Sequence, residues 1–131
     1  MHNRHEAVYH DFLDDVLSDL RECTAIAKKA GVPDDKIILD PGVGFGKTLD
    51  MNLSVTNHVD MLAELGYPVL LGTSRKSMIG LTLDLPSDQR LEGTLATTVI
   101  GIMKGCSFVR VHDVKENFRI IKMTEAILQS R

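Results

Sequence analysis

The sequence lacks the features that mark secreted, membrane-spanning or nucleic-acid-binding proteins. Its two cysteines, Cys23 and Cys106, stand far apart and outside any metal-type spacing such as CxxC, which favours thiols in a reducing compartment over a disulfide. No apolar run approaches the roughly 18 residues of a membrane span, and the first residues have no apolar core of a signal peptide. A net charge of -3 offers no basic surface to nucleic acid. We therefore expect a cytoplasmic protein without membrane or nucleic-acid partners.

The composition is that of an ordinary globular domain, with 44% hydrophobic and 25% charged residues in a chain of 131. Apolar residues at helical spacing predict four helices, and three short apolar runs predict strands. The helices are expected over about 7–30, 51–65, 89–104 and 114–129, with a short helical turn ending at 80, and the strands over 37–39, 69–71 and 108–111. Helices and almost wholly apolar strands that alternate in this way are typical of parallel α/β folds.

The number of strands is too small for a complete parallel fold. Three strands would leave two unpaired sheet edges, whereas an open doubly wound sheet usually has five or six strands and a βα barrel has eight. The sequence therefore predicts part of a larger α/β fold.

Polar residues gather where the three predicted strands end. Ligands of parallel α/β folds bind at that edge, so the pattern predicts a site there. Asp40 follows the first strand, and a carboxylate can accept two parallel N–H groups from an amidine-like edge such as that of a pterin or purine. The other candidates are the cations Arg75, Lys76 and Arg110, which suit anions, the imidazole of His112, and the hydroxyls of Ser74 and Ser77.

The triplet Gly46-Lys47-Thr48 matches the end of a phosphate-binding P-loop, but the rest of the loop does not. Pro41 occupies the position where the pattern needs its first glycine, and it removes both an N–H donor and torsional freedom. Asp40 would also repel phosphate. The sequence thus disfavours a nucleotide site, and Lys47 and Thr48 are predicted to be structural.

The same stretches resemble the dihydropteroate synthases, the folate-pathway enzymes that sulfonamide drugs inhibit. The resemblance rests on "MHNR", "IILDPGVGFGKT", "YPVLLGTSRKS" and "RLEGTLATTVIGIMKGCSFVRVHDV", and it extends over essentially the whole chain. It covers only the C-terminal half of such an enzyme. It therefore implies that residues 1–131 form the C-terminal part of a pterin-binding TIM (β/α)8 barrel, with about three strands and four helices, and that the N-terminal half is absent.

The resemblance implies a condensation of p-aminobenzoate with 6-hydroxymethyl-7,8-dihydropterin diphosphate, which gives dihydropteroate and pyrophosphate. It assigns the catalytic contacts to Lys76, Arg110 and His112. Lys76 would contact the pterin, and Arg110 and His112 would hold the diphosphate and stabilise the departing charge. Ser74 and Arg75 belong to the same substrate-binding signature, although the resemblance does not assign their contacts.

The resemblance assigns the remaining substrate contacts to five residues. Asp40 would bind the amino-pyrimidine edge of the pterin, and Met1 would pack on its ring. Gly44 and Phe45 would line the pterin and p-aminobenzoate pockets. Ser77, at the start of a helix, would receive the aminobenzoate carboxylate.

Parts of such an enzyme are expected to lie outside this chain. The resemblance implies Mg²⁺ as a cofactor, with a protein ligand in the absent half and none in this chain. The isolated chain is therefore expected to be inactive, and its exposed apolar surface predicts a homodimer or higher oligomer. Two alternatives remain open: a methyltetrahydrofolate methyltransferase, which should lack "SRKS" and "RVHDV", and a non-catalytic pterin-binding or assembly module.

Overall fold

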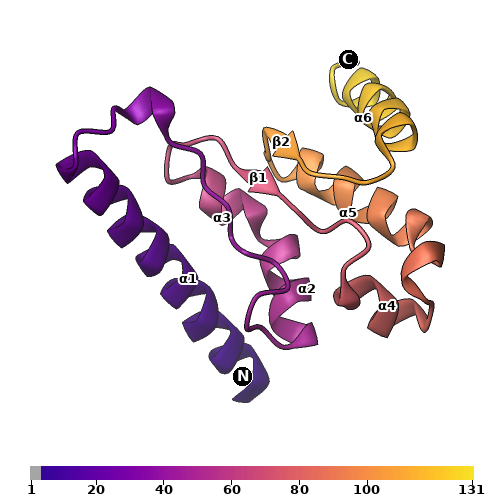
Figure 1. Cartoon of the computed structure of the whole chain (residues 1–131), viewed down its shortest axis with the longest axis horizontal. Coiled ribbons are helices and arrows are strands. Elements are labelled where there is room, and N and C mark those ends of the chain that lie inside the picture. Colours follow the sequence, from indigo (N-terminus) through magenta and orange to yellow (C-terminus); the bar gives the residue numbers. More distant parts are fainter. Residues whose placement is uncertain (1–3) are drawn as a thin grey trace.

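The computed structural model describes residues 4–131, with side chains from Phe12 onward, and consists of helices that alternate with short parallel strands (Figure 1). The α-helices are α1 (Arg4–Lys29), α2 (Leu49–Asn57), α3 (Val59–Ala63), α4 (Ser77–Leu83), α5 (Leu91–Met103) and α6 (Val114–Leu128). The strands are β1 (Leu70–Leu71) and β2 (Phe108–Val109), and two 3-10 helices, η1 (Asp34–Lys36) and η2 (Ser87–Gln89), lie in the connections.

The three predicted strand positions lie side by side. β1 pairs in parallel with β2, with Leu70 opposite Phe108, and a parallel bridge joins Leu39 to Val69. The N–H of Leu70 donates to the carbonyl of Leu39 at 2.8 Å. All three segments run in the same direction, so their carboxyl ends meet at one edge and bring the segments that follow them together.

Two predicted helix boundaries were wrong. The stretch expected as one helix over 51–65 is broken at His58, which has φ -122° and ψ 29°. The N–H of His58 bonds to the carbonyl three residues back, on Val55, and a ring nitrogen lies 2.8 Å from the Ser54 carbonyl. The apolar pattern continues across this break and therefore conceals it. The short turn expected to end at Gly80 continues as α4, which stops where Asp84 adopts a left-handed φ of 56°.

The core lies between the parallel segments and the helices that cover them. On α1, Leu13, Val16 and Leu17 are buried at helical spacing, and α1 lies along α2 (Figure 1). α4 and α5 approach closely, since a Cβ on Gly93 would stand 2.2 Å from Cγ2 of Ile79. The other core residues are Ile37, Leu39, Val43, Val55, Val59, Leu62, Val69, Leu71 and Met78.

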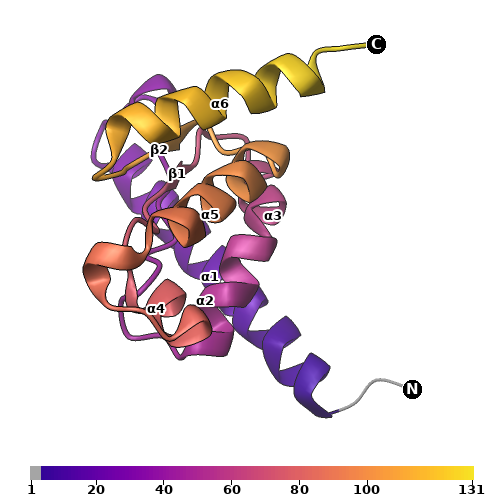
Figure 2. The ribbon, with the colours of Figure 1, turned by 90° about the vertical axis from the view of Figure 1, so that its right-hand side faces the viewer.

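Part of the apolar surface remains uncovered. Figure 2 shows α6 lying along α5 at one end of the molecule, away from α1. Phe108 of β2 is exposed, and the exposed apolar side chains of α6 are Val114, Phe118, Met123, Ile127 and Leu128. Among residues 4–131, no helix is long and apolar enough to cross a membrane.

Candidate functional site

A cavity of about 470 Å³ opens at the carboxyl edge of the parallel segments. It brings together residues from all three segments that follow the strands, although these residues lie up to 72 positions apart in the sequence. Its lining residues are Asp40, Phe45, Leu70, Gly72, Ser74, Lys76, Arg110, Val111 and His112. Six of the predicted site residues are in this lining, whereas Met1 lies outside the described residues.

The glycine loop after Leu39 uses its own amides to hold its shape. The Gly42 N–H donates to Oδ1 of Asp40 at 2.8 Å, and the Gly44 N–H donates to Oδ1 of Asn52 at 2.9 Å. The Phe45 N–H donates to the Gly42 carbonyl at 3.1 Å. These amides are therefore not free to wrap a phosphate, and the loop does not act as a P-loop.

Lys47 and Thr48 have the structural roles predicted for them. The Lys47 ammonium donates to the Gly42 carbonyl at 3.0 Å. Thr48 caps the N-terminus of α2, where its hydroxyl accepts the Met51 N–H at 3.2 Å. Asn52, on the first turn of the same helix, is 3% exposed. Sequence reasoning missed its role in holding the loop.

Lys76 crosses from the second strand-end segment to the glycine loop. Its ammonium donates to the carbonyl of Val43 and lies 4.8 Å from the centroid of the Phe45 ring, within the range of a cation–π contact. A Cβ on Gly44, whose φ is 91°, would stand 3.1 Å from Cδ of Lys76. The backbone conformation at position 44 therefore favours glycine, and a larger residue would also require the lysine that passes over it to shift.

The charges around the cavity act on Lys76. Burial lowers the pKa of its ammonium below the ordinary value of 10.5, and the Asp40 carboxylate opposes that change. The positive charges of Arg110 and Lys47 lower the pKa further. Such a mixed field, with one carboxylate among several cations, suits a ligand with a polar heterocycle at one end and an anion at the other.

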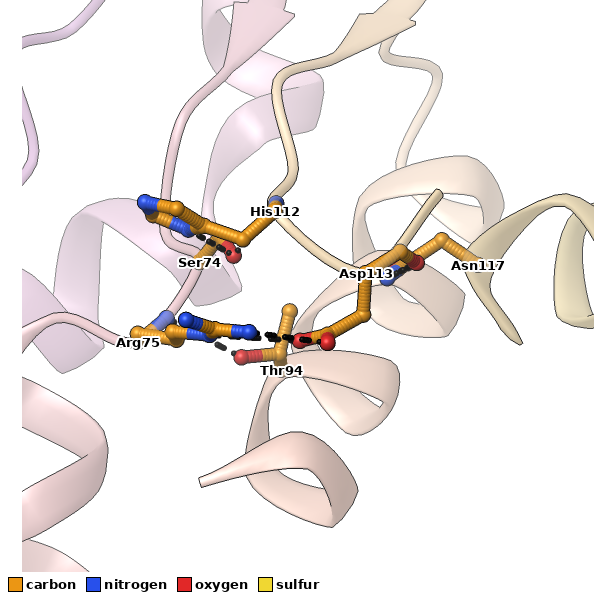
Figure 3. Close-up of polar contacts among 6 residues, drawn as sticks. All are labelled: Ser74, Arg75, Thr94, His112, Asp113 and Asn117. Carbon is orange, nitrogen blue, oxygen red and sulfur yellow. Dashed lines mark hydrogen bonds and ion pairs between the residues drawn. The ribbon is translucent and has the colours of Figure 1, made fainter. Parts of the chain in front are cut away.

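Ser74 and His112 form a close polar pair at the cavity wall (Figure 3). The Ser74 Oγ lies 2.7 Å from Nδ1 of His112 and also accepts the backbone N–H of His112 at 3.1 Å. Ser74 is 6% exposed, whereas His112 is exposed. The buried serine therefore fixes the segment after β2 against the segment after β1.

Arg75 and Ser77 do not line the cavity. The Arg75 guanidinium pairs with the carboxylate of Asp113 at 2.9 Å (Figure 3), and its hydrogen bond to that carboxylate raises its pKa above the ordinary value. Its backbone has a left-handed φ of 56°, and its N–H donates to the Thr94 hydroxyl at 3.1 Å. Ser77 is the exposed first residue of α4. Substrate contacts by either residue remain predictions.

A buried polar network behind the cavity was not foreseen from the sequence. Thr94, Thr98 and Asn117 are each at most 1% exposed. The Thr98 hydroxyl donates to Oδ1 of Asn117 at 2.7 Å, and Nδ2 of Asn117 donates to the Asp113 carbonyl at 2.8 Å. The available signal was the spacing of Thr94 and Thr98, four residues apart on one side of a mostly apolar helix.

Metal-ligating side chains do not gather in the described part of the chain. Mg²⁺ binds through carboxylate and carbonyl oxygens, and residues 4–131 contain no group of three or more His, Cys, Asp or Glu side chains that could hold a metal ion. Of the described residues that line the cavity, Asp40 is the one with a carboxylate.

The sequence matches known proteins over almost its whole length. A family described as "Pterin binding enzyme" matches residues 1–112. The dihydropteroate synthase of Clostridium beijerinckii is 62% identical over 130 residues, which cover 98% of this chain and 48% of that protein. The dihydropteroate synthase of Bacillus subtilis is 57% identical over 128 residues, covering 98% of this chain and 45% of that protein. The chain thus spans about half the length of these relatives.

Solved structures agree with these sequence matches. A dihydropteroate synthase from Coxiella burnetii, in complex with pteroic acid, superposes on 93% of this chain and 46% of that one with a TM-score of 0.90 and 38% identity. A Yersinia pestis dihydropteroate synthase in a sulfonamide drug complex superposes with a TM-score of 0.88 and 37% identity, covering 91% of this chain and 43% of that one. The predicted fold class, an α/β part of a (β/α)8 barrel, is confirmed. The chain belongs to the family of pterin-binding enzymes, and nearly all of its own length matches dihydropteroate synthases.

Proposed function

We propose that residues 1–131 form the C-terminal part of the pterin-binding barrel of a dihydropteroate synthase. The reaction would join p-aminobenzoate to 6-hydroxymethyl-7,8-dihydropterin diphosphate, with dihydropteroate and pyrophosphate as products. The observation that carries the proposal is the cavity at the strand ends, where the Asp40 carboxylate and the cations Lys76 and Arg110 face the same space as His112. The names of the relatives at 57–62% identity support it.

Asp40 is suited to bind the amino-pyrimidine edge of a pterin. Its Oδ1 accepts the Gly42 N–H at 2.8 Å, which fixes the carboxylate while both oxygens keep lone pairs for a ligand. Two parallel N–H groups of the pterin edge would meet these oxygens in a charge-assisted pair. Lys76 would meet the polar atoms of the same ring. Met1 is assigned to this ring by resemblance alone.

Arg110 and His112 would hold the diphosphate. They stand two residues apart on the extended segment that leaves β2, both are exposed, and both line the cavity. As the aniline nitrogen attacks the methylene carbon, the bond to the diphosphate oxygen breaks and negative charge develops on pyrophosphate. Donors already fixed at that position stabilise the departing charge without reorganisation.

The p-aminobenzoate pocket would lie beside the glycine loop. Phe45 is 75% exposed and stands under the Lys76 ammonium, so its ring can face an aromatic substrate, and Gly44 leaves room for it. Ser77 opens α4 and would receive the aminobenzoate carboxylate. Sulfonamides would compete for this pocket, in keeping with the sulfonamide complex of the Yersinia pestis relative.

Several features of the working enzyme would come from outside these residues. Mg²⁺ and its protein ligand belong to that part of the proposal. Association into a homodimer or higher oligomer would instead use the exposed apolar side chains of this chain, and the enzyme would act in the cytoplasm. Catalysis needs all reacting partners positioned together. The 131-residue chain alone is therefore expected to bind ligand weakly and to show no turnover.

A coupled assay of pyrophosphate release tests this function. p-Aminobenzoate, the pterin diphosphate and Mg²⁺ are incubated with the protein that contains this sequence, and with the 131-residue chain by itself. The proposal predicts that the longer protein releases pyrophosphate only when both substrates are present, and that the chain alone releases none. Failure of the longer protein to release pyrophosphate would contradict the proposal.

The two alternatives give different results in the same experiments. A methyltetrahydrofolate methyltransferase would have no use for Arg110 and His112 at the cavity and would not release pyrophosphate. A non-catalytic pterin-binding module would bind a pterin analogue without turnover even in the longer protein.

A further inference from the structure

Two adjacent pairs of residues join the segments that follow β1 and β2. Ser74 contacts His112, and the next residue on each segment forms the Arg75–Asp113 ion pair, with a second bond from Nε of Arg75 at 3.3 Å (Figure 3). The first pair faces the cavity and the second does not. Together they determine where the His112 ring lies.

The surroundings of the serine determine which way its hydrogen points. Its Oγ accepts the backbone N–H of His112, which occupies one lone pair. Within the described part of the chain, Nδ1 of the same histidine is the other partner of this oxygen, at 2.7 Å. Ser74 is 6% exposed, and a buried O–H without an acceptor is unfavourable; among the described residues, Nδ1 of His112 is the acceptor within reach of this O–H. The O–H therefore donates to Nδ1.

That direction fixes the tautomer of the ring. A neutral imidazole carries one hydrogen, and if Nδ1 accepts a hydrogen bond the hydrogen is on Nε2. Nε2 stands at the end of the ring that points away from Ser74 (Figure 3). The neutral histidine can then offer an N–H donor to an anion in the cavity. The opposite tautomer would offer a lone pair, which repels phosphate oxygens.

The supporting residues hold this geometry in place. The Arg75 carbonyl accepts from Nη1 of Arg90 at 2.9 Å, and the Arg75 N–H donates to Thr94. On the other segment, Asn117 holds the carbonyl of Asp113. Ser74 and His112 thus stand between anchored neighbours, and neither backbone is free to drift from the other.

We propose that Ser74 is a positioning residue that holds neutral His112 as the Nε2–H tautomer, so that the ring presents a donor to the diphosphate of the substrate. The inference rests on the proposed function for the identity of the anion, but the tautomer itself does not depend on it. Ser74 acts through His112 and needs no contact with substrate.

Nitrogen NMR of the histidine ring tests the tautomer directly. The protein is labelled with ¹⁵N in its histidines, five in all, and His112 is assigned from the signals that disappear in His112→Gln. At a pH where the ring is neutral, Nδ1 is expected to be the unprotonated nitrogen. Ser74→Ala should shift His112 toward a mixture of tautomers, and Ser74→Thr, which keeps the hydroxyl, should restore the original pattern. A wild-type ring protonated on Nδ1, or a pattern unchanged in Ser74→Ala, would overturn the proposal.

Calorimetric titration with inorganic pyrophosphate supplies the functional comparison. Ser74→Ala should weaken binding about tenfold, the scale of one hydrogen bond, and Ser74→Thr should bind within about threefold of wild type. Ser107→Ala, the same change at an exposed position, should bind as wild type does. Equal pyrophosphate affinity in Ser74→Ala and wild type would show that the tautomer does not contribute to anion binding and would overturn that part of the proposal. Absence of binding by wild type would instead contradict the proposed function, and the NMR result would still decide the tautomer.

Discussion

Replacing Asn117 should destabilise the fold by an amount that the surrounding hydrogen bonds determine. The side chain is 1% exposed and links α6 to α5 and to the segment after β2. In Asn117→Ala two hydrogen bonds are lost, but the Asp113 carbonyl keeps the backbone N–H of residue 117 at 3.1 Å, and the Thr98 hydroxyl can turn to the Thr94 carbonyl at 3.1 Å. With about 1 kcal/mol for each bond and a small cavity, we expect a loss of about 2–3 kcal/mol in the free energy of unfolding.

Asn117→Asp separates the hydrogen-bond contribution from the packing contribution. The carboxylate fills the same volume but directs a negative oxygen at the Asp113 carbonyl, so burial should raise its pKa above the roughly 3.9 of an unfolded aspartate. The folded state then binds the extra proton. The stability lost relative to wild type should be small below pH ~4, grow as pH rises toward the folded pKa, and remain at its maximum above it.

Urea denaturation at about pH 4 and about pH 7 measures both variants. At the higher pH Asn117→Asp should be less stable than Asn117→Ala, and at the lower pH the order should reverse. Asn57→Ala, an exposed asparagine at the end of α2, should lie within about 0.5 kcal/mol of wild type. Two Asn117 variants of equal stability at both pH values would refute the assignment of these hydrogen bonds.

Three further predictions concern the cavity and the surface. Competitive acylation across a pH range should show that Lys76 loses its proton at a lower pH than an ordinary lysine, because burial lowers its pKa. Asp40→Asn should lower the pKa of Lys76 further, and Arg110→Gln should raise it. If Lys76 titrates together with the other lysines, this prediction is wrong. Arg110→Ala and His112→Ala should each weaken pyrophosphate binding about tenfold or more. The affinity for a pterin analogue without a diphosphate should change little in the same titrations. If parent and variants bind pyrophosphate with equal affinity, Arg110 and His112 do not hold the anion. The exposed apolar face of α6 should drive association of the 131-residue chain, so light scattering should show an oligomer, and a stable monomer would be the contrary result.

The strands and the place of the site could be predicted because they depend on local pattern. Short apolar runs followed by polar residues predicted strands over 37–39, 69–71 and 108–111, and the structure places shorter paired segments within them, at Leu39, Leu70–Leu71 and Phe108–Val109. The rule that parallel strands share a binding edge predicted that Asp40 and Arg110 would meet. Both signals are present in the sequence around each strand.

The details of the site could not be predicted because they depend on contacts between distant segments. Arg75 and Lys76 are adjacent cations, and the sequence does not tell which one enters the cavity. Arg75 points away from the cavity because its backbone is left-handed and its guanidinium bonds to Asp113, 38 residues away. The same holds for Asn117, whose partner Thr98 is 19 residues away. Neither residue carries a local pattern that distinguishes it from an ordinary surface side chain.

The most direct test of the account is whether the Asp40 carboxylate binds the pterin. Calorimetric titration of the protein that contains this sequence with pteroic acid should give an affinity about 1–3 kcal/mol weaker for Asp40→Asn than for wild type, the scale of a charge-assisted hydrogen bond. Asp50→Asn, a matched change at an exposed position on the first turn of α2, should leave the affinity unchanged. If Asp40→Asn binds pteroic acid as tightly as wild type does, the cavity at the strand ends is not the pterin site.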